Sequence, residues 1–353
     1  MYIDSNIGGR MGGAAGADIH ALTERLRTIE RIGFDGVWST EVEHDPFLPL
    51  AIAASQVPKI QLGTGVAIAL ARNPMTMAQA ANDLQSFSGG RFILGLGTQI
   101  KAHIERRFSM PWSSPAERIE EYVSALRAIW HCWQTGETLD FQGRFYRHTL
   151  MTPMFTPEPH TYGSPQVAIA AVGPKMTRVA ARVADGLLIH GFTTERYLRE
   201  VTLPLVEETL SRSGRTRADF FISYPGLVAS GRNEEEISSA IGKVRRQIAF
   251  YGATPAYRNV LELHGWGDLH DELNRLSKTG QWSTMTSLID DEVLDTFAVV
   301  AHPQEAGTRV AARFSGLIDR FTVFTPYDLD EESAESIVTQ IRIGSRSGPA
   351  SRL

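Results

Sequence analysis

The chain has 353 residues, of which 42% are apolar, and its formal net charge is −5. One α/β barrel can absorb this length without a second domain, and the mild acidity gives no reason to expect nucleic acid or an anionic membrane as a partner. The sequence has no run of about 18 apolar residues that would span a membrane, its N-terminus lacks the order of a signal peptide, and Cys132 is its only cysteine, so we expect a cytoplasmic protein without an intrachain disulfide.

The first half of the chain alternates apolar strands with amphipathic helices. Asp18 and the pair Asn73-Pro74 stand where helices begin, because Asp and Asn accept hydrogen bonds from free N–H groups and proline suits the first helical position. The glycine-rich segment 8–16 is expected to be a mobile loop. The expected strands are 2–7, 36–39, 60–66 and 92–97, and the expected helices are 18–33, 46–57, 74–87 and 115–133.

Two insertions interrupt the second half of the chain. The first lies within about 98–165, and its irregular part, from 136, contains a small hairpin or extended arm at 141–146. The second, about 253–302, is expected to be irregular and is rich in Trp, His and Gly. The remaining expected strands are 166–171, 186–190, 220–230 and 320–324, and the remaining helices are 174–184, 194–213, one capped by Asn233, 303–314 and one from 331.

Eight buried strands, each followed by a helix, predict a parallel sheet closed into a (β/α)8 TIM barrel with insertions. We expect a single barrel domain over 1–345 and a disordered tail over 346–353, its composition already unfavourable after Ile343. In such barrels the functional site lies at the carboxyl ends of the strands. The segments of interest are therefore 40–45, 65–69, 98–103, 172–176 and 190–194.

The common short sequence motifs do not identify a function for this chain. Gly95-Leu96-Gly97 resembles the start of a dinucleotide-binding motif, but Ile100 replaces its third glycine. There is no P-loop, no H-E-x-x-H and no G-x-S-x-G, and the histidines are scattered. We therefore expect no metal site and no Rossmann fold.

Two loops that follow predicted strands contain residues suited to catalysis or ligand binding. Glu41 and His44 belong to a group of four ionisable residues in five after the second strand, which suits an acid/base pair, although a solvated loop with Asp45 as a helix cap is the alternative. Val172-Gly173-Pro174-Lys175-Met176 precedes a helix, where free N–H groups and a lysine suit a phosphate. An ordinary turn with proline at the first helical position is the alternative there.

Five segments together resemble the bacterial luciferase-like monooxygenase superfamily, with a closer likeness to actinobacterial oxidoreductases that use the deazaflavin coenzyme F420. The likeness covers about residues 18–326. The segments are Leu62–Val66, Arg72–Pro74, Gly90–Thr98, Ala180–Gly186 and Gly33–Trp38.

The resemblance implies a barrel with a flavin or deazaflavin across the carboxyl ends of its strands. The ring would rest against a non-prolyl cis peptide at Gly65-Val66, and the phosphate would lie at residues 172–176. The residues that the resemblance places at the cofactor are Thr40, Gly65, Val66, Thr98, His103, Val172, Gly173, Pro174, Lys175, Met176 and His190.

The chain departs from the sugar-phosphate dehydrogenases of the superfamily. Those proteins have an Asp-His pair after the second strand and a Glu after the fourth. In this chain the second-strand region reads Ser39-Thr40-Glu41-Val42-Glu43-His44, and the position of the Glu falls on Ile100. A sugar phosphate is therefore a weaker expectation as substrate. The expected catalytic residues are His44 and Glu41, as proton donor or acceptor.

The resulting prediction is an F420-dependent oxidoreductase that transfers a hydride to or from a small, hydrophobic substrate. The alternative within the superfamily is an FMN-dependent two-component monooxygenase, which needs a separate reductase. A barrel hydrolase and a non-catalytic coenzyme-binding protein are further alternatives. The apolar surroundings of Trp112, Trp266 and Trp282 suit either a hydrophobic substrate or the surface of a homodimer, the assembly that the resemblance implies.

Overall fold

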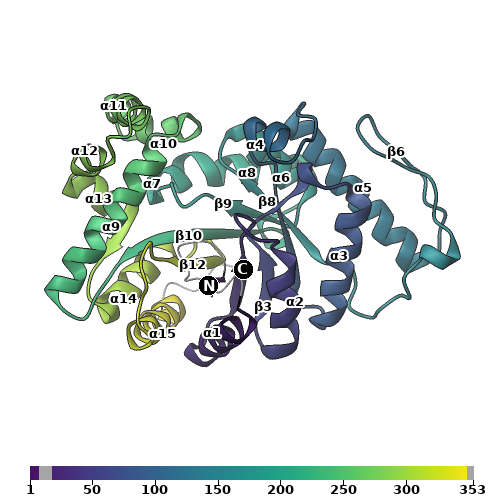
Figure 1. The fold of residues 1–353 in the computed structure, drawn as a ribbon, viewed down its shortest axis with the longest axis horizontal. Helices are drawn as coiled ribbons and strands as arrows, with labels where there is room; N and C mark the ends of the chain where they lie inside the picture. The colour runs from purple at the N-terminus through teal and green to yellow at the C-terminus, as the bar shows by residue number, and fades with distance from the viewer. Residues whose placement is uncertain (8–17, 348–353) are drawn as a thin grey trace.

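Eight parallel strands close into a barrel in the computed structural model, which describes residues 1–7 and 18–347 (Figure 1). Each strand pairs with its neighbours in the order β1-β2-β3-β5-β8-β9-β10-β12, and β12 returns to β1. The predicted (β/α)8 barrel is confirmed. The barrel strands are β1 (Tyr2–Ile7), β2 (Gly36–Ser39), β3 (Gln61–Thr64), β5 (Phe92–Gly97), β8 (Gln166–Ala171), β9 (Gly186–Ile189), β10 (Phe221–Ala229) and β12 (Arg320–Phe324).

The helices around the barrel begin where the sequence places caps. The side chains of Asp18, Asn73 and Asn233 each accept a backbone N–H of the first turn, and Gly33 ends the first helix with a φ of 92°. The surrounding helices are α1 (Ile19–Ile32), α2 (Phe47–Gln56), α3 (Pro74–Phe87), α4 (Lys101–Arg106), α5 (Pro115–Thr135), α6 (Pro174–Val183), α7 (Glu195–Tyr197), the π-helical turn η4 (Leu198–Thr202), α8 (Leu203–Arg212), α9 (Glu234–Gly252), α14 (Pro303–Phe314) and α15 (Glu331–Ser347).

The two insertions lie at opposite ends of the molecule in Figure 1. The first is the predicted arm, which carries the antiparallel pair β6 (Phe141–Gln142) and β7 (Arg147–His148) and the turn η3 (Pro153–Phe155). The second is not irregular, and that prediction is wrong. It forms η6 (Pro255–Tyr257), α10 (Arg258–Leu263), α11 (Gly267–Ser277), α12 (Trp282–Ser287), α13 (Asp291–Phe297) and β11 (Ala298–Val300).

The second insertion folds because its helices share a hydrophobic core of their own with α9, here called the second core. This core includes Phe192, Val244, Leu261, Leu273 and Phe297. Strand β11 also joins the barrel sheet: Leu227–Ala229 of β10 pair with it, while residues 223–227 pair with β12. The insertion is therefore held both by apolar packing and by backbone hydrogen bonds.

Smaller differences from the sequence prediction concern element ends. The third strand stops at Thr64, and β4 (Ala67–Ile68) follows after a short break. Helix α15 continues to Ser347, so the tail predicted from 346 is helical at its first two residues. The turn η5 (Arg217–Asp219) precedes β10, and η2 (Ala69–Ala71) precedes α3. The predicted mobile loop at 8–16 and residues 348–353 lie outside the described residues.

The end of the barrel where the strands begin is closed by a buried ion pair. The Arg320 guanidinium donates to both carboxylate oxygens of Asp4, at 2.8 and 2.7 Å, and the Trp38 indole donates to Asp4 Oδ2 at 2.9 Å. Above this layer Trp38, Ile93, Ala168 and Leu188 fill the interior. In the described part of the chain no helix is long and apolar enough to cross a membrane.

Candidate functional site

The mouth of the barrel, meaning the carboxyl ends of its strands and the loops that follow them, is built from the strand alternation. Side chains two positions apart on a strand point to the same face. Because Leu188 and Ala168 fill the interior, His190 and Ala170 point toward the mouth one layer higher. By the same alternation Asn6 follows the buried Asp4, and its amide Oδ1 is buried without a hydrogen-bond partner in the described residues.

One side of the mouth is made of small residues that leave no room for side chains. A Cβ added to Gly95 would lie 1.8 Å from the Thr64 carbonyl oxygen, and one added to Gly97 would lie 2.6 Å from Val66 Cγ2. The peptide bond Gly65-Val66 between these contacts is cis, as the resemblance implied. These residues, Gly65, Val66, Gly95 and Gly97, lie side by side on β5 and after the end of β3, and are here called the cradle.

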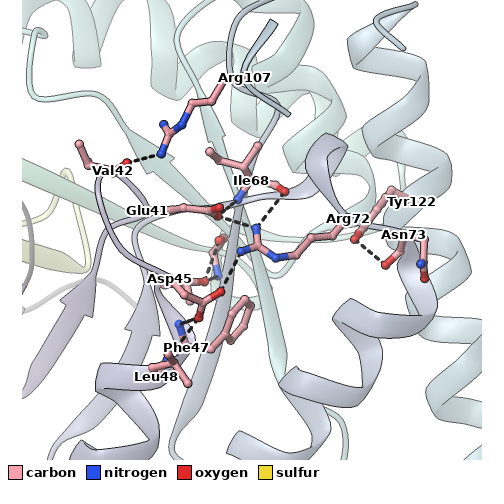
Figure 2. A network of polar contacts seen from close by, with 12 residues as sticks. Glu41, Val42, Asp45, Phe47, Leu48, Ile68, Arg72, Asn73, Arg107 and Tyr122 are labelled. Atoms are coloured by element: carbon pink, nitrogen blue, oxygen red, sulfur yellow. Dashed lines mark hydrogen bonds and ion pairs between the residues drawn. The ribbon is translucent and has the colours of Figure 1, made fainter. Parts of the chain in front are cut away.

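Glu41 is held by a network of polar contacts beside the cradle (Figure 2). Its Oε2 accepts from Arg72 Nη1 at 2.6 Å and from the Ile68 N–H at 2.7 Å, while Arg72 Nη2 donates to Asp45 at 3.0 Å. Burial alone would lower the pKa of Arg72, but hydrogen bonds and charge from Glu41 and Asp45 outweigh it and raise that pKa. The geometry fits Glu41 as the residue that ties the loop after β2 to the segment after Val66.

The other polar residues predicted on this side are more open. His44 is exposed in the loop after β2, and His103 is exposed on α4. Thr40 and Thr98 are half-buried at the ends of β2 and β5. The short helix α4 was not among the predicted elements. Arg107, which follows its last turn, donates to the Val42 carbonyl at 2.6 Å and so joins the two loops (Figure 2).

The helix start at Gly173 has the predicted form. Gly173 is the N-cap of α6, Pro174 occupies the first position, and no side chain caps the helix. The N–H groups of Lys175 and Met176 therefore lack acceptors within the helix. Lys175 is 73% exposed and its Nζ lies 2.6 Å from Glu117 Oε1, so the lysine is already paired with an acid from α5.

His190 follows β9 and lies next to that helix start, because Ile189 pairs with Ala171. Its ring stacks on Tyr257 at a centroid distance of 4.3 Å and meets Tyr251 edge-on at 4.6 Å. Its Nδ1 accepts the Phe192 N–H at 3.0 Å. Burial lowers the pKa of His190 to about 4, so the imidazole is neutral near pH 7.

A small cavity of about 20 Å³ lies behind His190, between β8, β9 and the π-helical turn. Thr193 lines it, and the buried Oγ1 of that residue has no partner among the described residues. The volume suits about one water molecule. This cavity is therefore too small to hold an organic substrate.

Four residues at the mouth were not found by the sequence analysis. Asn6 could have been found, since it lies two positions after the buried Asp4 in the first strand. Arg72 was noted only as part of a motif, and Tyr251 and Tyr257 come from α9 and η6 with no local signal. Among the described residues no group of three or more His, Cys, Asp and Glu side chains could hold a metal ion.

Comparison with known proteins shows that the chain matches one protein family. The model of the family described as luciferase-like monooxygenase matches residues 2–320. An uncharacterized protein of Mycobacterium tuberculosis is 52% identical over 320 residues, covering 91% of this chain and 92% of that protein. A 5,10-methylenetetrahydromethanopterin reductase of Archaeoglobus fulgidus is 27% identical over 340 residues, covering 94% and 91%.

Two solved structures share the fold. The coenzyme F420-dependent tetrahydromethanopterin reductase of Methanopyrus kandleri aligns with a TM-score of 0.77 at 19% identity, covering 96% of this chain and 97% of that one. The oxygenating constituent of 3,6-diketocamphane monooxygenase from Pseudomonas putida, in complex with FMN, aligns with a TM-score of 0.70 at 14% identity, covering 98% of both chains. At these identities the likeness supports the fold alone.

Proposed function

The chain belongs to the luciferase-like monooxygenase family, and we propose that it is an oxidoreductase that transfers a hydride between coenzyme F420 and a small, apolar organic substrate. Support comes from the Archaeoglobus fulgidus relative, a reductase that aligns over nearly the whole chain, and from the fold of an F420-dependent reductase. The observation that carries the proposal is the cradle at the barrel mouth.

The residues at the mouth fit a planar coenzyme with a phosphate. Gly95 and Gly97 keep side chains out of the cradle, because a Cβ at either position would collide with Thr64 or Val66, and glycine lets a ligand approach the backbone closely. The Oδ1 of Asn6, which has no partner among the described residues, offers an acceptor to a ring N–H. The open start of α6 offers N–H groups and a positive helix end to a phosphate.

When bound there, the deazaflavin supplies or accepts the hydride. The protein would then have three tasks: Gly65, Val66 and Gly97 would support the ring, Gly173 and Lys175 would hold the phosphate, and the mouth would orient the substrate. Orientation of this kind accounts for most of the expected rate gain, because hydride transfer requires a short, aligned approach. His44 remains our proposed proton donor on the β2 side, with Glu41 assigned to positioning.

An FMN-dependent monooxygenase with a separate reductase is the second candidate, favoured by the fold shared with an FMN-bound protein. The two are separated by titrating the purified protein with oxidised and reduced F420 and with FMN while following the fluorescence of its tryptophans. We expect saturable quenching by F420 and negligible quenching by FMN. Preference for FMN would favour the monooxygenase, and no response to either would contradict both.

We also propose that the chain forms a homodimer. The arm carries large apolar side chains in contact with solvent, Leu150, Met154 and Phe155, and exposed apolar groups of this size are typical of surfaces that meet a partner. Light scattering coupled to gel filtration gives the mass. A monomer at all concentrations would contradict this proposal.

A further inference from the structure

Three aromatic rings stand together on the β9 side of the mouth, opposite the residues after β2. Besides the two contacts of His190, the rings of Tyr251 and Tyr257 meet edge-on with centroids 6.2 Å apart. The hydroxyls of both tyrosines and His190 Nε2 have no partner among the described residues, yet none of the three is a buried unpaired atom. Each polar tip therefore reaches solvent.

The hydrogen bond at Nδ1 fixes what His190 can offer. Nδ1 accepts the Phe192 N–H, so in the neutral ring the proton is on Nε2, which becomes a donor. Burial keeps the ring neutral, and burial also raises the pKa of Tyr257 to about 12. The cluster presents two neutral donors, an imidazole N–H and a phenol O–H.

Among the described residues, no charged group contributes to the pKa shifts of His190 and Tyr257. Burial is the one cause that acts on His190 and Tyr257. The nearest cation in sequence, Arg258, donates to Glu262 at 2.6 Å and also to Asp271. Its charge is thus already paired with two carboxylates of its own insertion, so the described part of the chain offers no adjacent unpaired cation to a phosphate or carboxylate on the ligand.

We propose that His190 and Tyr257, with Tyr251 as a wall, receive one uncharged oxygen of the substrate, which makes the substrate an apolar ketone, aldehyde or alcohol. The inference rests on the proposed function in taking the barrel mouth as the place of reaction. It places the proton donor on the β9 side and so replaces His44 in that role, while Glu41 stays held by Arg72 on the β2 side. His190 and Tyr257 are then catalytic residues.

The proposed reaction is the reduction of a carbonyl compound to an alcohol. The reduced deazaflavin, when bound, would supply the hydride to the carbonyl carbon, and the π electron pair of the C=O bond would move onto oxygen. That oxygen takes the proton of the Tyr257 hydroxyl, which water replaces at the accessible tip. His190 Nε2–H donates to the same oxygen throughout, a role that a neutral imidazole can fill. Alcohol oxidation is the reverse.

The test uses ligand binding by the full chain without coenzyme, so that it does not depend on turnover. Isothermal titration with acetophenone, ethylbenzene and benzoate compares a ketone, the same shape without oxygen, and a charged analogue. Tyr257→Phe and His190→Phe keep a ring in place and remove one donor each. Tyr162→Phe, which removes a hydroxyl from a half-exposed ring on the arm, is the matched control, and circular dichroism checks folding.

We expect the unmodified protein to bind acetophenone about tenfold more tightly than ethylbenzene, the size expected for one or two neutral hydrogen bonds. Each of the two site variants should reduce that ratio to about threefold or less without weakening ethylbenzene, and Tyr162→Phe should preserve it. A ratio near one in the unmodified protein, a ratio unchanged in both site variants, no binding of either neutral probe, or tighter binding of benzoate would overturn the inference.

Titration of the same preparations with F420 separates this inference from the proposed function. Loss of F420 binding with the oxygen preference intact would refute the coenzyme and leave the oxygen site standing. F420 binding without any oxygen preference would do the opposite.

Discussion

Replacing Glu41 by Gln decides whether this residue positions the mouth or transfers a proton. The carboxylate is 6% exposed and Arg72 is 23% exposed, so solvent screens their attraction only in part. Gln keeps an acceptor for the Ile68 N–H but removes the charge facing Arg72, which retains Asp45 at 3.0 Å. A charge-assisted hydrogen bond in such a place contributes about 1.5–3 kcal/mol, and the remaining partner suggests the middle of that range, about 2 kcal/mol.

Chemical and thermal unfolding of Glu41→Gln measure this loss, and coenzyme titration reports on the cradle. We expect a lower unfolding midpoint together with weaker F420 binding, because the segment after Val66 loses its tie. Glu105→Gln on α4, whose one ion pair within the described residues is a loose contact with Lys101 at 3.9 Å, should change neither. Unchanged stability and coenzyme affinity combined with a collapse of turnover would refute the reasoning and make Glu41 a catalytic residue.

Three further predictions concern residues at the barrel mouth. Gly97→Ala places a Cβ 2.6 Å from Val66 Cγ2, so it should cost about 1–3 kcal/mol of stability and weaken F420 binding. The control Gly242→Ala, in α9 with nothing within 4 Å of the added Cβ, should stabilise the protein by about 0.5–1 kcal/mol. Equal effects of the two variants on denaturation would contradict the crowding argument. Burial lowers the pKa of folded His190 to about 4, below the unfolded value of about 6.5, so about 3 kcal/mol of folding stability is present above pH 6.5 and is lost as pH falls toward 4. Melting curves at pH 6.5 and pH 4 should therefore show a smaller loss of stability on acidification in His190→Phe than in the unmodified protein. Identical losses would disprove this assignment. Lys175→Ala should change stability by no more than about 0.5 kcal/mol but weaken F420 binding severalfold. Glu117→Gln, which frees Lys175 from its pair, should strengthen F420 binding. An unchanged F420 affinity in both variants would argue against a phosphate at α6.

Much of the fold could be predicted because its signals are local. The caps at Asp18, Asn73 and Asn233 act within one helical turn, and all three hold in the structure. The eight buried strands were recognisable from short apolar runs, which are enough to predict a parallel sheet. The helices of the second insertion could not be predicted in the same way, because α10 and α12 have only six residues each and none of α10, α11 and α12 has a side-chain cap.

The site was harder to predict, because its contacts join residues far apart in the chain. Glu41 and Arg72 are 31 positions apart, and nothing in the sequence shows that they meet. His190 was placed at the mouth by its position after a strand. Its aromatic neighbours depend on how α9 and η6 fold back over β9, which pattern reasoning does not reach.

The separation of the two hydrophobic cores has a consequence for how such a protein can diverge. The cradle rests on the barrel, whereas Tyr251 and Tyr257 pack with the second core. Substitutions at distant sites without shared partners combine almost independently. Selection can therefore retune which molecule is accepted by repacking the second core, while the shape that receives the coenzyme is inherited unaltered.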